Sequence, residues 1–199
     1  LGSATVWTGS TPHGQGHVTS WAMVASDRLG IPFDRIDVLW GDTDRDPAGG
    51  VTGGSRSAQV CGVPVGRAST MIVEEAKHVA AALLEASVDD IVLDTERGVF
   101  HVAGAPSISR SWTDITAQAG GPMKAEDAWE ASSPTYPFGT NLALVEVDLD
   151  TGRVELLRLI GCDDAGTILN PLLFEGQLHG GMASGVAQAL LEEIIYSPD

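Results

Sequence analysis

Two glycine-rich segments carry polar side chains of the kinds that bind anionic or oxygen-rich ligands. Residues 13–17 read His-Gly-Gln-Gly-His, and residues 52–57 read Thr-Gly-Gly-Ser-Arg-Ser. Glycine lets the backbone approach a ligand closely, and consecutive exposed amides form anion-binding concavities, best where a helix begins. The two loops together therefore predict a binding site for one large anionic ligand.

A third segment, residues 170–181, places Gln177 beside glycines at the start of an apolar helical pattern. The amide of Gln15 can both donate and accept hydrogen bonds, which suits an oxo or sulfido ligand or a pterin edge. The alternatives are that Gln15 bonds only its own loop and that Gln177 is a polar first-turn helix residue. Arg56 could pair with a phosphate or form a salt bridge within a very acidic protein.

Taken in order, these segments resemble the molybdenum-cofactor-binding large subunit of the xanthine dehydrogenase, aldehyde oxidase and carbon monoxide dehydrogenase family. The resemblance is to the C-terminal half of that subunit's cofactor domain and runs nearly end to end. It also includes a helix closed by Gly30-Ile31-Pro32, the stretch Gly41-Asp42-Thr43-Asp44, a hairpin at 145–152 and residues 163–193. The ordered set is more specific than any of its members.

The resemblance implies a molybdopterin cofactor, with the cytosine dinucleotide form that is common in bacterial relatives. The residues to which it assigns cofactor binding are His13, Gly14, Gln15, Gly54, Ser55, Arg56, Ser57 and Gln177. In that family the cofactor's own atoms hold the molybdenum, so no residue is predicted to ligate a metal. The spacing of His17, His78, His101 and His179 also matches no metal site.

The resemblance implies that the catalytic base is a glutamate in a Gly-x-Gly-Glu context, which we expect beyond Asp199. No catalytic residue is therefore identified in this sequence. Asp163, Asp164 and the pair Glu192-Glu193 could act as acid–base carboxylates, but their positions at a strand end and on a helix surface favour structural roles.

The implied reaction is the oxidative hydroxylation, with water, of an aldehyde, an N-heterocycle or a similar small substrate. The 2Fe-2S and FAD groups are expected on partner domains or subunits, so the expected partners are the rest of the large subunit, an iron–sulfur subunit and an FAD subunit. The segment alone should be inactive. The rival interpretation is a catalytically silent cofactor-binding or structural fragment that assembles with other subunits. An unrelated nucleotide-binding protein would require a GxGxxG or GxxxxGK[ST] motif, and neither occurs.

Composition limits the remaining possibilities. The 199 residues, 43% of them hydrophobic, predict a substantial core in one large domain or two tightly packed lobes. With the resemblance, we expect residues 1–199 to form one molybdopterin-binding domain segment, with two lobes at 1–130 and 131–199 as the variant. The formal charge of −16 repels nucleic acids and anionic membranes. Cys61 and Cys162 lack the spacing of a cluster or zinc site. No apolar run approaches the roughly 20 residues that span a bilayer. We expect a cytoplasmic location and leave a periplasmic one open.

Alternating helical and strand patterns predict an α+β (mixed α/β) fold. The expected helices are one with Val18, Trp21, Ala22, Ala25 and Leu29 on one face, one over 57–85 that includes Met71, a short one from Ser111 to Ala119, and one over 174–195. The expected strands are 4–7, 36–40, a hairpin within 91–102 and a hairpin of 142–149 with 154–160. Apolar positions on both faces of the last hairpin predict a covered sheet.

Overall fold

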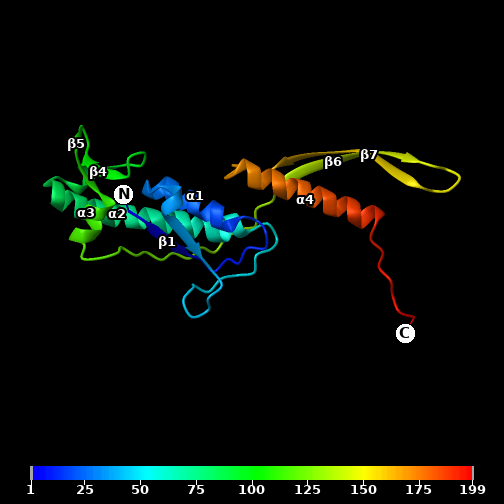
Figure 1. Ribbon diagram of the computed structural model, residues 1–199, viewed down its shortest axis with the longest axis horizontal. Coiled ribbons are helices and arrows are strands. Elements are labelled where there is room, and N and C mark those ends of the chain that lie inside the picture. The colour runs from blue at the N-terminus through cyan, green and yellow to red at the C-terminus, as the bar shows by residue number, and fades with distance from the viewer. Residues whose placement is uncertain (1, 199) are drawn as a thin grey trace. The chain divides into compact units, whose positions relative to one another are not determined.

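The computed structural model describes residues 2–198 and confirms the mixed α/β class (Figure 1). The chain divides into two compact units, Leu1–Pro134 and Thr135–Asp199, which we call unit 1 and unit 2. Each unit is described by itself. Sequence analysis placed a lobe boundary four residues earlier, and the status of the units as separate lobes stays a prediction.

Unit 1 begins with a parallel β-α-β arrangement. Strand β1 (Ala4–Trp7) pairs with β2 (Ile36–Leu39), and Ala4 lies opposite Ile36. Helix α1 (His17–Leu29) and the short 3-10 helix η1 (Phe33–Arg35) connect them. Parallel strands need such a crossover because the chain must return to the starting end of the first strand, which a tight turn cannot do.

Helix α1 buries one stripe of side chains and ends at a glycine. Trp21, Ala22, Ala25 and Leu29 are buried as expected, whereas Val18 is 38% exposed, so its inward assignment was wrong. Gly30 ends the helix in the left-handed region, at φ 61°, and donates its N–H to the Ser26 carbonyl. A residue with a Cβ is disfavoured there.

The second long helix starts irregularly. A π-helical turn, η2 (Ala58–Gly62), leads into α2 (Val63–Leu84), and Pro64 lies in the first turn of α2, where its missing N–H is not needed. The helix packs against α1 and against the sheet and helix that follow it in unit 1, and its buried residues are Val65, Ser69, Val73, Ala76 and Ala80. The helical pattern was predicted correctly. Its apolar positions do not all face the core, because Met71 is 49% exposed.

After the 3-10 turn η3 (Val88–Asp90), a three-stranded antiparallel sheet covers the far end of α2. Its strands are β3 (Ile91–Asp94), β4 (Val99–Val102) and β5 (Ala105–Ser111). The predicted hairpin corresponds to β3 and β4, whereas β5 was not predicted. Its composition is polar and contains a proline, so it lacks the apolar alternation of a strand.

Helix α3 (Trp112–Gln118) closes the core of unit 1. Ser111 and Asp114 form a capping box at its start, as their spacing suggested. The Trp112 indole donates to the Leu29 carbonyl at 2.8 Å, and its ring meets Phe100 edge-on, with centroids 4.9 Å apart. These contacts join the end of α1 to the sheet.

Residues 120–134 have no regular structure, but they are attached to α2 and η2. The Arg67 guanidinium lies 3.1 Å from an Asp127 carboxylate oxygen and 5.3 Å from the centre of the Trp129 ring. The Gln59 amide donates to the Ser133 carbonyl at 3.2 Å. The segment therefore crosses the surface of unit 1 along a defined path.

Unit 2 consists of one long hairpin and one helix. Strand β6 (Phe138–Val147) pairs antiparallel with β7 (Val154–Asp164). At the turn, Asp148 Oδ1 accepts hydrogen bonds from the N–H groups of Asp150 and Thr151, at 2.9 and 3.0 Å, and Gly152 adopts φ 72°. These backbone hydrogen bonds lower the pKa of Asp148. The predicted hairpin is confirmed and is longer than expected.

Helix α4 (Pro171–Leu190) is capped by Asn170, whose side chain accepts from the N–H of Leu173 at 3.1 Å. The helix ends at Leu190, so the predicted end at Ile195 was wrong. Glu192 and Glu193 would place negative charge at the negative end of the helix dipole, and the isoleucines that follow are weaker helix formers than Leu or Ala. Among residues 2–198, no helix is long and apolar enough to cross a membrane.

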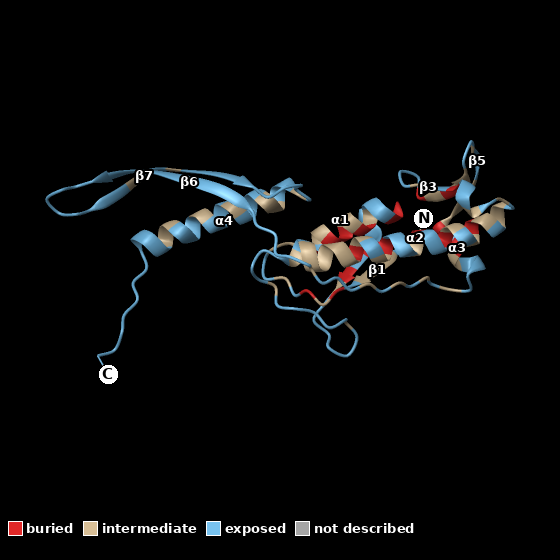
Figure 2. Cartoon of the chain, turned by 180° about the vertical axis from the view of Figure 1, so that it is seen from behind, coloured by how far each residue is buried: buried red, intermediate tan, exposed pale blue. Residues whose placement is uncertain are grey.

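The two units differ sharply in burial (Figure 2). All of the buried positions described lie in unit 1, and residues 135–198 include none. Within unit 2, α4 covers one face of the hairpin, and the opposite face carries exposed Leu142, Leu144 and Ile160. The predicted covering of both faces is therefore not found within this unit.

Candidate functional site

The two glycine-rich loops of unit 1 leave the same edge of the sheet. The first follows the carboxyl end of β1 and leads into α1, and the second follows β2 and leads into η2 and α2. Their backbones cross where Gly9 meets Gly49. A Cβ built on Gly9 would lie 2.5 Å from the Cα of Gly49 and 2.6 Å from the Pro47 carbonyl oxygen, so glycine is required at the crossing.

The helices that follow these loops also start side by side. A Cβ built on Gly62, the last residue of η2, would lie 2.9 Å from Cζ3 of Trp21, in the second turn of α1. The indole ring therefore packs directly on the backbone at the start of α2. The structure thus brings residues 13–16 and 54–57 to one edge of unit 1.

The first loop has an open backbone and an inward-folded glutamine. Gly14 and Gly16 adopt φ 109° and 75°, and a Cβ on Gly14 would meet nothing within 4 Å. Gln15 Oε1 accepts from the His13 N–H at 2.6 Å, so the glutamine does bond its own loop. Its Nε2 donates to no group in the part of the chain that the structure describes, and it can still serve a ligand.

The second loop holds two consecutive left-handed residues. Gly54 and Ser55 adopt φ 65° and 55°, and a Cβ on Gly54 would meet nothing within 4 Å. Left-handed backbone is strained for a residue other than glycine, and such strain often accompanies a binding function. Ser57 then precedes η2. Successive exposed amides at a helix start form an anion-binding concavity.

Arg56 and Thr52 complete the second loop. The Arg56 guanidinium donates from Nε and Nη2 to the Val51 carbonyl, at 3.3 and 2.9 Å, and forms no ion pair with any described residue. The salt-bridge alternative for Arg56 is therefore not observed. Thr52 Oγ1 is buried and has no hydrogen-bond partner among residues 2–198. A buried hydroxyl without a partner is costly, and a ligand could satisfy it.

Sequence reasoning missed a buried polar cluster behind the first loop. Thr8, Ser10, His17 and Trp21, which we call the Ser10 cluster, are all at most 6% exposed. The Ser10 hydroxyl lies 3.1 Å from the Trp21 indole nitrogen, 3.3 Å from His17 Nδ1 and 3.3 Å from the Thr8 hydroxyl. Burial, and secondarily the charge of His13, lower the pKa of His17. Ser10 lies in a loop and His17 at the start of α1, so the two residues share no regular element and no periodic sequence pattern revealed the cluster.

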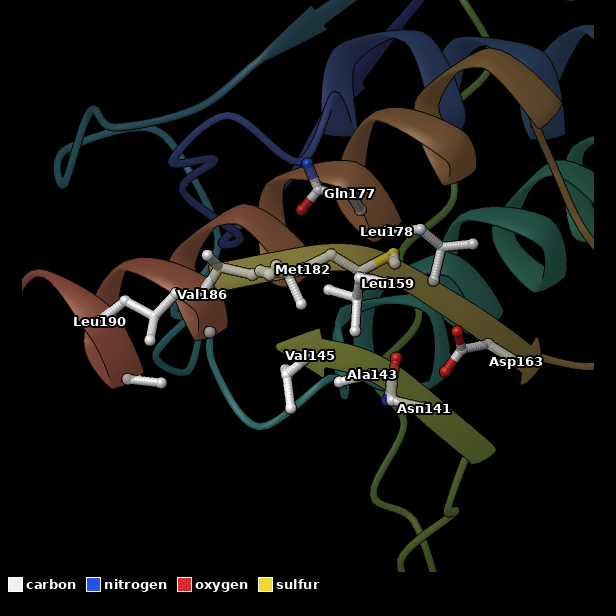
Figure 3. A pocket seen from close by; sticks show the side chains of 14 residues that line it. Asn141, Ala143, Val145, Leu159, Asp163, Gln177, Leu178, Met182, Val186 and Leu190 are labelled. Carbon is white, nitrogen blue, oxygen red and sulfur yellow. The ribbon is translucent and has the colours of Figure 1, made fainter. Parts of the chain in front are cut away.

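Gln177 belongs to unit 2, where it lines a groove of about 470 Å³ between α4 and the hairpin (Figure 3). Most of the lining is apolar, with Leu159, Leu178 and Met182 among it. Its polar members are Asn141, Asp163 and Gln177, one each from β6, β7 and α4. This arrangement gives a mostly apolar groove with one polar side chain from each of its three elements.

Two glycines make room for the polar side chains of the groove. Gly139 lies opposite Asp163 in the hairpin, and a Cβ there would collide with the carboxylate of that residue. Gly161 lies opposite Asn141, and a Cβ there would lie 3.1 Å from the Asn141 amide oxygen. The carboxylate of Asp163 thus lies across the hairpin surface. Its predicted structural role is consistent with this position.

No group of three or more His, Cys, Asp or Glu residues with the geometry of a metal site occurs between residues 2 and 198. His17 is buried in the Ser10 cluster, whereas His78 and His179 are exposed on helices. The polar groups that the loops present are backbone amides, hydroxyls and carboxamides, which suit an organic anion with several acceptors.

Comparison with known proteins identifies the fold. A family model described as "Molybdopterin cofactor-binding domain" matches residues 1–199. The carbon monoxide dehydrogenase large chain of Hydrogenophaga pseudoflava is 37% identical over 203 residues, which cover 98% of this chain and 25% of that protein. The nicotine 6-hydroxylase large subunit of Paenarthrobacter nicotinovorans is 36% identical over 206 residues, with coverages of 98% and 25%.

Solved structures agree. A Cu,Mo-CO dehydrogenase in its carbon monoxide reduced state matches with a TM-score of 0.86 and 34% identity, over 95% of this chain and 24% of the other. Quinoline 2-oxidoreductase from Pseudomonas putida 86 matches with a TM-score of 0.82 and 33% identity, over 94% and 25%. The chain thus spans about a quarter of the length of these relatives. The resemblance deduced from the sequence is confirmed, and this chain belongs to the family of molybdopterin cofactor-binding domains.

Proposed function

We propose that this chain holds a molybdopterin cofactor, in the cytosine dinucleotide form, as part of a molybdenum hydroxylase. The observation that carries the proposal is the pair of open glycine loops at one edge of unit 1, in a chain that the family model matches throughout. When bound, the molybdenum centre supplies the two-electron oxidation that introduces oxygen from water into a substrate C–H bond. The substrate is an aldehyde, an N-heterocycle or a similar small molecule.

The loops fit such a group in three respects. The backbones at Gly14 and Gly54 face open space, so the cofactor can approach them closely. Gly54 and Ser55 are both left-handed and lie just before η2. Backbone amides at the start of a helix favour phosphates such as those of a dinucleotide. The buried Thr52 hydroxyl lacks a partner that the cofactor can provide.

Each predicted binding residue then has a definite task. The free Nε2 of Gln15 donates to the pterin end of the cofactor, next to His13 and Gly14. The amides and hydroxyls of Ser55 and Ser57 bind the dithiolene and phosphate end. The Arg56 guanidinium, which uses Nε and Nη2 on the Val51 carbonyl, turns its remaining N–H groups to phosphate. Gln177 is proposed as a further cofactor-binding residue and lines the groove of unit 2.

The rest of the enzyme lies outside these residues. We propose that the catalytic glutamate is supplied by the remaining part of the large subunit, and that 2Fe-2S and FAD groups on partner subunits receive the electrons. This is consistent with the names of several relatives, which are large chains or subunits of complexes. A cytoplasmic location belongs to the same proposal.

The test is cofactor loading of the complete assembly that contains this chain. We expect stoichiometric molybdenum and pterin and electron transfer to a dye. Gln15→Ala and Gln177→Ala should each lower molybdenum content and turnover more than they lower the thermal midpoint, because the two residues touch ligand rather than core. Gln118→Ala and Gln188→Ala replace exposed helical glutamines and serve as matched controls.

Three outcomes would contradict all or part of the proposal. A colourless, metal-free assembly would favour the rival interpretation, a catalytically silent structural module. Equal losses of thermal stability and cofactor in Gln15→Ala would remove the binding role of that residue. If both variants retain full molybdenum content, the proposed site lies elsewhere in the assembly.

A further inference from the structure

The Ser10 cluster joins the two ends of the loop that carries Gln15. Thr8 and Ser10 lie just after β1, and His17 and Trp21 lie in the first two turns of α1. All four are nearly excluded from solvent, with Ser10 at 1% and His17 at 4% exposure. Buried polar side chains are costly unless their hydrogen bonds are satisfied together, so this network has one preferred arrangement.

The hydrogen bonds of the cluster favour one tautomer of the His17 imidazole. The Trp21 indole can only donate, so Ser10 Oγ accepts from it at 3.1 Å. The Thr8 hydroxyl also donates to Ser10 Oγ, while it accepts from the Ser10 N–H at 3.2 Å. The single proton of the Ser10 hydroxyl is then directed to His17 Nδ1, 3.3 Å away. This arrangement corresponds to the neutral His17 tautomer that carries its proton on Nε2, in which Nδ1 accepts.

The loop itself has little else to hold it. Gly14 and Gly16 are both in the left-handed region, and glycine loses more conformational entropy on ordering than any other residue. Within residues 13–16, the side-chain hydrogen bond that the structure describes runs from the His13 N–H to Gln15 Oε1. The two ends of the loop are therefore held in position mainly by the buried Ser10 cluster.

We propose that Ser10 and His17 are positioning residues that hold the 13–16 loop, and with it Gln15, in the arrangement that receives the cofactor. This inference rests on the proposed function, because it names residues that act on the same site through the loop. Their side chains touch no ligand. A loop that is ordered before binding does not lose that entropy when the ligand arrives, so occupancy rises.

Through Trp21, the Ser10 cluster also contacts the helix that follows the second glycine-rich loop. Trp21 donates to Ser10 on one side and packs its ring on Gly62 on the other, at the start of the helix that follows the second loop. His17 also stacks on Trp21, with ring centroids 5.2 Å apart. A change at Ser10 is therefore transmitted to both loops through one indole ring.

The test measures molybdenum and pterin per chain in the complete assembly, purified at a temperature where every variant is folded by circular dichroism. His17→Leu and Ser10→Ala should lower occupancy about ten-fold, the scale on which residues behind a ligand act. Trp21→Phe, which removes the indole N–H together with part of the ring, should lower it in the same direction. His17→Asn keeps an acceptor near the position of Nδ1 and should restore most of the occupancy.

The controls separate positioning from stability. Val73→Ala removes buried core volume from α2, away from the loops, and should lower the thermal midpoint without lowering occupancy. His78→Asn, on the exposed face of α2, should change neither. Occupancy that follows the thermal midpoint through the whole series, or His17→Asn no better than His17→Leu, would overturn the inference. A wild-type assembly without molybdenum would instead overturn the proposed function.

Discussion

At the scale of single residues, His17 connects the candidate site to the stability of unit 1. Burial lowers its pKa from the ordinary value of 6.5. The folded chain then binds fewer protons at this position than the unfolded chain, so stability rises with pH across the interval between the two pKa values. The contribution of His17 is complete above 6.5 and is lost as the pH falls below it.

We therefore expect the free energy of unfolding to decrease as the pH is lowered from 7.5 to 5.5. Equilibrium urea denaturation, followed by tryptophan fluorescence, measures this dependence. In His17→Asn the slope between these pH values should be smaller, while His78→Asn should retain the wild-type slope. An unchanged slope in His17→Asn would show that the imidazole is not held neutral by the fold.

Residue identity was easier to predict than residue partners. The glycines at 14 and 54 were recognisable because few other functions explain open glycine turns before helices, and both do adopt left-handed backbone. The partners of Gln15 and Arg56 were not predictable, since an amide or guanidinium can reach several acceptors. The Ser10 cluster escaped notice because its members are ordinary residues brought together by the fold.

At the scale of elements, the contact between α1 and the start of α2 depends on Gly62. A methyl group there would lie 2.9 Å from Cζ3 of Trp21, in a helical backbone that alanine itself tolerates. Overpacking of this kind costs about 1–3 kcal/mol. Gly62→Ala should therefore destabilise unit 1 by that amount in equilibrium denaturation.

The matched control lies four residues along. A Cβ on Gly66 would make an ordinary contact, 3.6 Å from the Val24 side chain. Gly66→Ala should therefore stabilise α2, by up to about 1 kcal/mol, since alanine is the better helix former. If both variants change stability alike, the packing of Trp21 on Gly62 does not limit this interface.

The capping box of α3 gives a second test at this scale. The Ser111 hydroxyl accepts from the Asp114 N–H at 3.3 Å and donates to the Asp114 carboxylate at 2.8 Å. Hydrogen bonds from Ser111 also lower the pKa of Asp114. Ser111→Ala should cost about 0.5–2 kcal/mol in thermal or chemical denaturation. Ser107→Ala, on the exposed part of β5, is the control, and an equal cost there would contradict the assignment.

Elements with a strong local signal were predicted well, and those defined by tertiary contacts were not. The cap at Ser111, the stop at Gly30 and the turn at 148–152 each follow from short-range chemistry. Strand β5 has no such signal, because its pairing with β4 determines its conformation. The predicted end of α4 was wrong because apolar residues continue beyond Leu190. The charges that follow, Glu192 and Glu193, are unfavourable at the C-terminal end of a helix.

At the scale of the whole molecule, unit 2 has more apolar surface than it can bury. Phe138, Leu142 and Leu172 are 74%, 63% and 79% exposed. A two-stranded hairpin with one helix is marginal in water, and large apolar patches normally mark interaction surfaces. Composition alone predicted a substantial core, and only the structure shows that this core is confined to unit 1.

The isolated 199-residue chain should bind a hydrophobic dye strongly and self-associate at micromolar concentration. Analytical ultracentrifugation and dye fluorescence measure both properties. Leu142→Lys, on the exposed face of the hairpin, should reduce the association, whereas Val51→Lys, at an isolated exposed position of unit 1, should not. A monodisperse wild-type monomer that binds no dye would contradict this prediction.

The crossing of Gly9 over Gly49 has a consequence for engineering. Because the two loop backbones touch with no side chain between them, neither loop can be lengthened or rotated without displacing the other. Grafting one of these segments from a homologous enzyme should therefore fail unless its counterpart is transplanted together with it. The two glycine-rich loops should therefore be exchanged together, as one unit.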